Sequence, residues 1–313
     1  MHAKLRPIIF LSIRKEGAQM PLSSFSYVSA DGFKIAAYRW DPAGEPRAAV
    51  QLTHGMGEHA QRYDHVARAL NGAGFVVYAQ DHRGHGASAE PGALGDLGQG
   101  SWPALVDDIG LLTARIRAEH PGVPLILLGH SMGSFAVQQY LLDHSADVDG
   151  AVLTGTAVID LLEPALDLDQ PLDLAAFNAP FQPARTDFDW LSRDEAVVDA
   201  YVADPRCGFG IDTESARAMF AGARRLADPA QVAAMRSSLP VHIAVGESDP
   251  VNGGLALLTP LVDRYRAAGL ADVTVRTYPD ARHEILNETN SAEVIAELAG
   301  WLDRVLADSG RAS

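Results

Sequence analysis

The chain has 313 residues, of which 47% are hydrophobic and 21% are charged, so it can fill a substantial core. Its formal net charge of −15 argues against nucleic-acid partners and against electrostatic attachment to an anionic membrane surface. The single cysteine, Cys207, excludes an intramolecular disulfide and fits a reducing compartment.

Residues 1–22 are predicted to form a flexible N-terminal extension outside the folded core. They begin with the basic run Lys4-Leu5-Arg6, which precedes an apolar run over residues 7–13. This order is typical of a signal peptide, but the apolar run is short, charges follow at once and no small-residue cleavage site is evident. We therefore expect a cytoplasmic protein, with export as the weaker alternative, and leave open whether Met1 or Met20 is the natural start. No segment has the length of a membrane-spanning helix.

Strand and helix patterns alternate along the rest of the chain. Apolar or alternating runs predict strands at 26–28, 34–40, 48–52, 75–79, 124–128, 150–154, 241–246 and 273–278. Apolar residues at helical spacing predict helices among them, over 63–70, 105–116, 134–142 and 295–305. The alternation predicts an α/β fold in which helices flank a mostly parallel central sheet. Functional sites in such sheets lie at the carboxyl ends of the strands.

The pentapeptide Gly129-His130-Ser131-Met132-Gly133 lies between the predicted strand at 124–128 and the predicted helix at 134–142. A G-x-S-x-G sequence between a strand and a helix is typical of a nucleophile elbow, in which a sharp turn exposes the serine hydroxyl. The alternative is an ordinary helix start with a capping serine. The context favours Ser131 as a nucleophile.

A serine nucleophile needs a histidine base and an acid that orients it, and elbows of this kind have them in the order Ser, Asp or Glu, His. Asp249 follows the predicted strand at 241–246, and His283 lies in the loop after the strand at 273–278. Asp280 is a weaker candidate for the acid because it belongs to the histidine's own loop. We assign Asp249 as the orienting acid and His283 as the base.

The same chemistry needs an oxyanion hole, in which backbone N–H groups stabilise the charge that develops on the substrate carbonyl. One donor is expected from Met132, the residue after the nucleophile, and the other from the loop after the strand at 48–52. That loop reads His54-Gly55-Met56-Gly57, so the second donor is the N–H of Met56. The alternative is a glycine turn without a catalytic role.

Together these motifs resemble the monoacylglycerol lipase and lysophospholipase-like branch of the α/β-hydrolases. The resemblance covers residues 24–306 and rests on 54–59 with Arg62-Tyr63, on 81–88, 129–133, 246–251 and 283–288. It implies an α/β-hydrolase fold with a helical cap inserted after the sixth strand. Residues 159–235, where the alternation stops, are the expected cap, and residues 23–158 and 236–313 form the core. Apolar cap residues such as Phe177, Phe181 and Trp190 either line an acyl tunnel or pack the cap onto the core.

The resemblance also implies a serine esterase of lipid metabolism that needs no cofactor. The sequence motifs themselves give no reason to expect a metal site. We expect cleavage of a lipid-like ester, foremost a monoacylglycerol to glycerol and fatty acid, through an acyl-enzyme. A lysophospholipase or short-chain carboxylesterase is the alternative, and an acyltransferase, a peptidase or a non-catalytic binding protein is less favoured. Glu58, Arg62 and Tyr63 either hold a polar head group or stabilise the oxyanion loop. The partner is a small ester or lipid, and transient contact between the cap and a membrane surface is left open.

Overall fold

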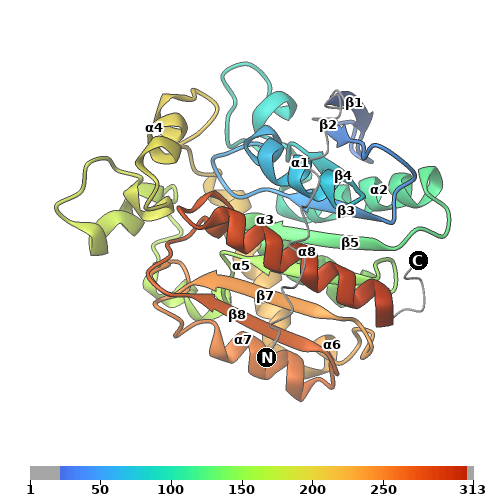
Figure 1. Cartoon of the computed structure of the whole chain (residues 1–313). Coiled ribbons are helices and arrows are strands. Elements are labelled where there is room, and N and C mark those ends of the chain that lie inside the picture. The colour runs from blue at the N-terminus through green and yellow to red at the C-terminus, as the bar shows by residue number, and fades with distance from the viewer. Residues whose placement is uncertain (1–21, 309–313) are drawn as a thin grey trace, which may run out of the picture.

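The structure, a computed structural model, describes residues 22–308 (Figure 1). The expectation of a flexible extension over residues 1–22 therefore lies, except for Leu22, outside the described residues. Within them, eight strands form one sheet in the order β1-β2-β4-β3-β5-β6-β7-β8. They are β1 (Ser23–Val28), β2 (Lys34–Trp40), β3 (Ala48–Thr53), β4 (Phe75–Gln80), β5 (Leu125–His130), β6 (Gly150–Thr154), β7 (Val241–Gly246) and β8 (Val273–Tyr278).

The sheet is parallel from β4 to β8, while β2 pairs antiparallel with both β1 and β4. Strands β3 to β7 are buried along their whole length, as expected for parallel strands covered on both faces. The edge strand β1 instead alternates between exposed and half-buried residues. The predicted mostly parallel α/β sheet is thereby confirmed.

Helices cover both faces of the sheet. One face packs on α2 (Ser101–Glu119), α3 (Met132–His144) and α7 (Thr259–Ala267), and the other on α1 (Asp64–Gly72) and α8 (Ser291–Asp308). The α8 residues predicted to share one apolar face are buried: Ile295, Leu298, Leu302 and Val305. In Figure 1, α8 crosses in front of the sheet in red. Short 3-10 helices lie in three of the loops between strands and helices: Ala60–Tyr63, Gly86–Ser88 and Ile285–Asn287.

Between β6 and β7 the chain forms helices and no strand, as far as the described residues show. The α-helices are α4 (Glu195–Ala203), α5 (Thr213–Ala223) and α6 (Pro229–Val232). The 3-10 helices are Ile159–Leu161, Glu163–Ala165, Leu174–Phe181, Asp189–Leu191 and Arg224–Ala227. Figure 1 shows α4 and the chain before it at the left, beyond the arrowheads of β7 and β8. We refer to residues 159–235 as the cap segment; its exact limits and its role as a lid stay predictions.

Candidate active site

Ser131 is the single residue between β5 and α3, and it has a strained backbone. Its φ of 50° and ψ of −124° lie in a region that residues with a side chain rarely adopt. The Ser131 N–H donates to the carbonyl oxygen of Thr154 at 2.9 Å, which ties the turn to β6. Its side chain makes no hydrogen bond that caps α3, so the structure does not favour the capping alternative.

The glycines on either side of Ser131 make this sharp turn feasible. A Cβ atom at Gly133 would overlap the carbonyl oxygens of Thr53 and His54 at the end of β3. A Cβ atom at Gly129 would lie 2.7 Å from the Cα of Ser134. The backbone of α3 therefore approaches β3 and β5 so closely that only glycine fits, which is the geometry expected of an elbow.

Asp249 and His283 meet although 34 residues separate them in the sequence. Asp249 lies just beyond β7, and His283 lies in the loop between β8 and the turn Ile285–Asn287. The Nδ1 atom of His283 is 2.9 Å from Oδ2 and 3.0 Å from Oδ1 of Asp249, and both side chains are buried. The rival acid Asp280 is exposed.

The surroundings of His283 act on its pKa in opposite directions. Burial lowers the pKa, but the charge and hydrogen bond of the Asp249 carboxylate raise it, and Glu284 and Glu58 add to the rise. The net result is a pKa above the ordinary value of 6.5. For neighbouring His130 the balance is reversed: burial and the charge of His283 outweigh the charge of Glu284 and lower the pKa of His130 to about 3. The two imidazoles therefore differ in basicity although their ring centres are 4.8 Å apart.

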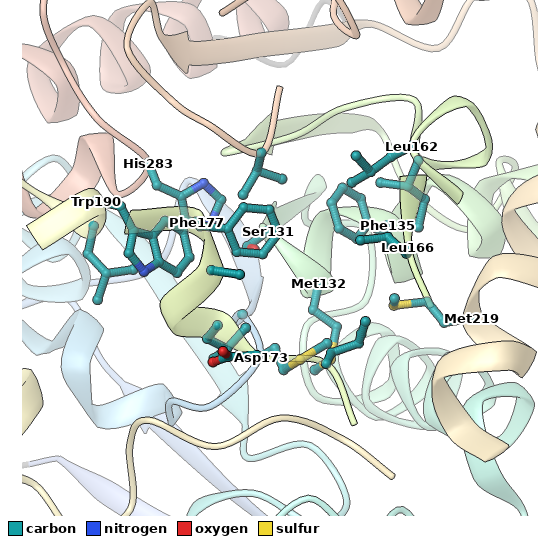
Figure 2. Close-up of a pocket in the computed structure, with 18 of the residues that line it drawn as sticks. Ser131, Met132, Phe135, Leu162, Leu166, Asp173, Phe177, Trp190, Met219 and His283 are labelled. Atoms are coloured by element: carbon teal, nitrogen blue, oxygen red, sulfur yellow. The ribbon is translucent and has the colours of Figure 1, made fainter. Parts of the chain in front are cut away.

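Ser131 and His283 line the same pocket, which has a volume of about 370 Å³. Its wall is mainly apolar and comes from both the core and the cap segment. Figure 2 shows Ser131 near the middle of this pocket, with His283, Phe177 and Trp190 on one side and Phe135, Leu162, Leu166 and Met219 on the other.

Two of the three aromatic cap residues considered above belong to this wall. Phe177 and Trp190 line the pocket, and the indole of Trp190 packs against the His283 ring with 4.9 Å between ring centres. The guanidinium of Arg282 lies over the ring of Phe181, which is not part of the wall.

The loop that carries Met56 lies directly beside the elbow. A Cβ atom at Gly55 would be 3.1 Å from the Cβ of Ser131. Within residues 22–308 the Met56 N–H has no hydrogen-bond partner. Met132 is the first residue of α3, where helix geometry leaves the N–H without an intrahelical acceptor. Both N–H groups predicted as oxyanion donors are thus free to bind a ligand next to Ser131.

Glu58, Arg62 and Tyr63 are bound to one another and to this loop. The Glu58 carboxylate accepts hydrogen bonds from the Gly55 N–H at 2.6 Å, from Arg62 at 2.6 Å and from the Tyr63 hydroxyl at 2.8 Å. Arg62 also forms a bidentate ion pair with Glu284 at 2.6 and 2.7 Å. These bonds favour the alternative in which the three residues stabilise the loop, since only Glu58 reaches the pocket wall.

Glu284 is a site residue that the sequence reasoning did not assign. It follows His283, and through Arg62 it connects the histidine loop to the oxyanion loop. The sequence shows only that Arg62 follows Glu58 by four residues, a spacing at which the two side chains can pair. Which second carboxylate Arg62 binds depends on tertiary contacts.

Two groups of side chains within residues 22–308 have the spacing of metal ligands: Glu58 with His130 and Glu284, and His59 with Asp204 and Cys207. In the first group Arg62 already neutralises both carboxylates. In the second group Arg206 pairs with Asp204 at 2.9 Å. In both groups an arginine thus already pairs with the carboxylates that a metal ion would need.

The sheet order, the elbow and the His–Asp pair at the strand ends define an α/β-hydrolase. The chain belongs to the hydrolase family described as serine aminopeptidase S33, whose profile matches residues 44–290. Among its relatives, monoacylglycerol lipase of Mycolicibacterium smegmatis is 35% identical over 288 residues, covering 90% of this chain and 96% of that protein. Human monoglyceride lipase is 30% identical over 298 residues, covering 91% and 92%.

Solved structures agree with this placement. A thermostable carboxyl esterase from Bacillus coagulans in complex with glycerol superposes with a TM-score of 0.82 at 26% identity, covering 92% of this chain and 99% of that one. A lipase in an open form superposes with a TM-score of 0.77 at 27% identity, covering 91% and 99%. The predicted superfamily and branch are confirmed.

Proposed function

We propose that this carboxylic ester hydrolase cleaves monoacylglycerols to glycerol and fatty acid through an acyl-enzyme on Ser131. The observation that carries the proposal is the placement of the strained Ser131 and of His283, which is bonded to the buried Asp249, on one mainly apolar pocket. An apolar wall suits an acyl chain, because each buried methylene group contributes about 0.8 kcal/mol. The similarity to monoacylglycerol lipases over nine-tenths of the chain supports the same substrate class.

In the first step, His283 Nε2 takes the hydroxyl proton of Ser131 while Oγ attacks the ester carbonyl carbon. The carbonyl oxygen becomes an oxyanion, which accepts hydrogen bonds from the N–H groups of Met56 and Met132. Asp249 accepts the Nδ1 proton of His283, which fixes the tautomer and stabilises the imidazolium. The glycerol oxygen then leaves with the proton from Nε2, and the acyl group stays on Ser131.

In the second step, water replaces the alcohol. His283 takes a proton from the water molecule, whose oxygen attacks the acyl carbon to form a second tetrahedral intermediate. Its collapse breaks the bond to Ser131 Oγ, which regains its proton from His283. The products are a fatty acid and the free enzyme, so neither step requires a cofactor.

The charges in the pocket bear on two alternative substrates. A peptidase that acts on free N-termini needs a carboxylate for the substrate ammonium group. Of the carboxylates in the wall, Glu58 and Glu284 are paired with Arg62, whereas Asp167 and Asp173 form no ion pair within residues 22–308. A lysophospholipase needs a cation for the phosphate, and no lysine or arginine of residues 22–308 lines the pocket. The lack of a lysine or arginine in the wall favours a head group without a phosphate, and the substrate panel below decides between an ester and a peptide substrate.

None of the described helices combines the length and apolar character needed to cross a membrane. A cytoplasmic location and transient contact of the cap segment with a membrane surface stay predictions.

The experiment that tests the proposed function compares purified protein with its Ser131→Ala variant on a panel of substrates. The panel contains monoacylglycerols of graded chain length, p-nitrophenyl esters, lysophosphatidylcholine and an aminoacyl anilide. We expect Ser131-dependent glycerol release to dominate. Activity confined to short esters, to the phospholipid or to the anilide would mean that the protein is a short-chain carboxylesterase, a lysophospholipase or a peptidase instead. Transfer of the acyl group to added glycerol instead of water would indicate an acyltransferase.

A further inference from the structure

A tyrosine of the cap segment is bonded to the loop that carries the Met56 N–H. Tyr201 lies on α4, and its hydroxyl donates a hydrogen bond to the carbonyl oxygen of Gly57 at 2.8 Å. The Gly208 N–H donates to the same carbonyl oxygen at 3.0 Å and to the Tyr201 hydroxyl at 3.1 Å. Two donors from the cap segment thus converge on the residue that follows Met56.

The fit between this part of the cap segment and the loop is tight. Gly57 has a φ of +65°, and a Cβ atom there would overlap the carbonyl oxygen of Phe209. Backbone therefore rests directly on backbone, with no side chain between them to absorb a shift. A displacement of the cap segment at this point would be passed to the neighbouring Met56 peptide.

Tyr201 also contacts the other support of the same loop. Its ring lies under the guanidinium of Arg62, with 4.7 Å between the guanidinium carbon and the ring centre. Arg62 holds the Glu58 carboxylate, which in turn accepts the Gly55 N–H. The Met56 peptide is thus flanked by two hydrogen-bonded anchors, Gly55 and Gly57, and Tyr201 contributes to both.

We infer that Tyr201 is a positioning residue that fixes the oxyanion hole, so that the cap segment forms part of the catalytic centre as well as the wall of the pocket. This inference rests on the proposed function. Its physical basis is that oxyanion donors act only when they are held in place before the reaction, and a misplacement of about 1 Å can cost ~100-fold in rate. Burial raises the pKa of the Tyr201 hydroxyl, and the charge of Glu284 adds to the rise, so the group remains a donor.

A purely structural role of Tyr201 predicts different kinetics. If the hydroxyl only held the cap segment in place, its removal would change substrate binding or thermal stability and leave the chemical step as it is. If it positions the oxyanion hole, its removal lowers kcat and the affinity for transition-state analogues together, because both depend on the Met56 N–H.

The test is the Tyr201→Phe variant, which keeps the ring over Arg62 and removes only the hydroxyl. The matched control is Tyr265→Phe on α7, since the Tyr265 hydroxyl is buried and has no partner among the described residues. Kinetics are measured on a monoacylglycerol and on a soluble p-nitrophenyl ester. Binding of a trifluoromethyl ketone, whose adduct with a serine carries an oxyanion, is measured by titration calorimetry.

For Tyr201→Phe we expect kcat to fall about tenfold with KM within about twofold, and the ketone affinity to fall by the same factor as kcat/KM. Tyr265→Phe should match the wild type in all three quantities. An unchanged kcat, or a change in KM alone with unchanged ketone affinity, would overturn the inference. The ketone measurement needs no substrate, so it tests Tyr201 even where the ester panel fails and the proposed function falls.

Discussion

At the scale of single residues, Ser131, the proposed nucleophile, has an unfavourable backbone conformation. Such conformations cost roughly 1–3 kcal/mol each, and glycine adopts them freely. We expect Ser131→Ala and Ser131→Gly to lose hydrolysis alike, whereas only the glycine variant relieves the strain. After the entropic cost of glycine, Ser131→Gly should be about 1 kcal/mol more stable than Ser131→Ala. Urea unfolding of both variants measures this difference, and an alanine variant as stable as the glycine variant would show that the turn is unstrained.

In the proposed mechanism the pH dependence of activity follows from His283, which must be neutral to accept the Ser131 proton. Its pKa lies above 6.5 because the Asp249 carboxylate outweighs burial, so kcat/KM should rise with pH through that raised value. In Asp249→Asn the carboxylate is gone and burial remains, so the pKa falls. The acid limb then moves to lower pH while the plateau drops by roughly 10³–10⁴-fold. Profiles of kcat/KM against pH for both proteins test this prediction. An acid limb at the same pH in both proteins would mean that Asp249 does not raise the pKa of His283.

The raised pKa of His283 also affects stability, which changes with pH in the direction opposite to activity. The contribution of His283 to folding is complete below the unfolded pKa of about 6.5 and is lost as pH rises through the higher folded value. Activity and this part of the folding free energy therefore change in opposite directions over the same pH window.

At the scale of elements, Arg62 holds the oxyanion loop and the histidine loop together by its bonds to Glu58 and Glu284. Arg62→Met would leave two buried carboxylates without their cation, which typically costs about 3–5 kcal/mol. The matched control is Arg68→Met, because Arg68 pairs with Asp64 on the surface of α1, where a pair contributes about 1 kcal/mol or less. Urea unfolding measures both changes. Equal, small losses would mean that Arg62 does not connect the loops.

The sequence predicts elements well where burial is continuous. The fully buried strands β3 to β7 follow from their mainly apolar runs, and the one-sided face of α8 follows from its helical periodicity. The elbow is also a local signal, because it is marked by glycine spacing between a strand and a helix. The interior of the cap segment could not be predicted in the same way. Its short 3-10 turns have no periodicity of their own and depend on what they pack against.

In the candidate site, too, the residues marked by local sequence patterns could be predicted and those that depend on tertiary contacts could not. The pairing of Asp249 with His283 is predicted from chain order and strand ends, and the two side chains are bonded in the structure. Glu284 and Tyr201 are not, because each acts through a partner more than a hundred residues away in the sequence. Pairs of this kind arise from tertiary packing and leave no local pattern.

At the scale of the whole molecule, several histidines are buried in their neutral form. Burial lowers the pKa of His82 to about 3, of His85 to about 4 and of His242 to about 4. Their contribution to stability is complete above the unfolded pKa of about 6.5 and is lost as pH falls toward these folded values. The free energy of unfolding should therefore fall steeply below about pH 6.5.

His242, far from the pocket on β7, offers a clean test of this acid sensitivity. Its replacement by asparagine removes one proton taken up on unfolding, which lowers the slope of stability against pH by about 1.4 kcal/mol per pH unit. Urea unfolding at several pH values between about 4 and 6.5 gives the slope. An unchanged slope in His242→Asn would mean that this histidine is protonated in the folded protein.

The most direct test of the central claim is covalent labelling of the protein with a fluorophosphonate during monoacylglycerol hydrolysis. Intact mass and peptide mapping give the number and position of adducts, and glycerol release is followed at the same time points. We predict one equivalent of label on Ser131 and a loss of hydrolysis in proportion to labelling, with Ser131→Ala neither labelled nor active. Label on another residue, or hydrolysis that survives complete labelling of Ser131, would contradict the assignment of the active site.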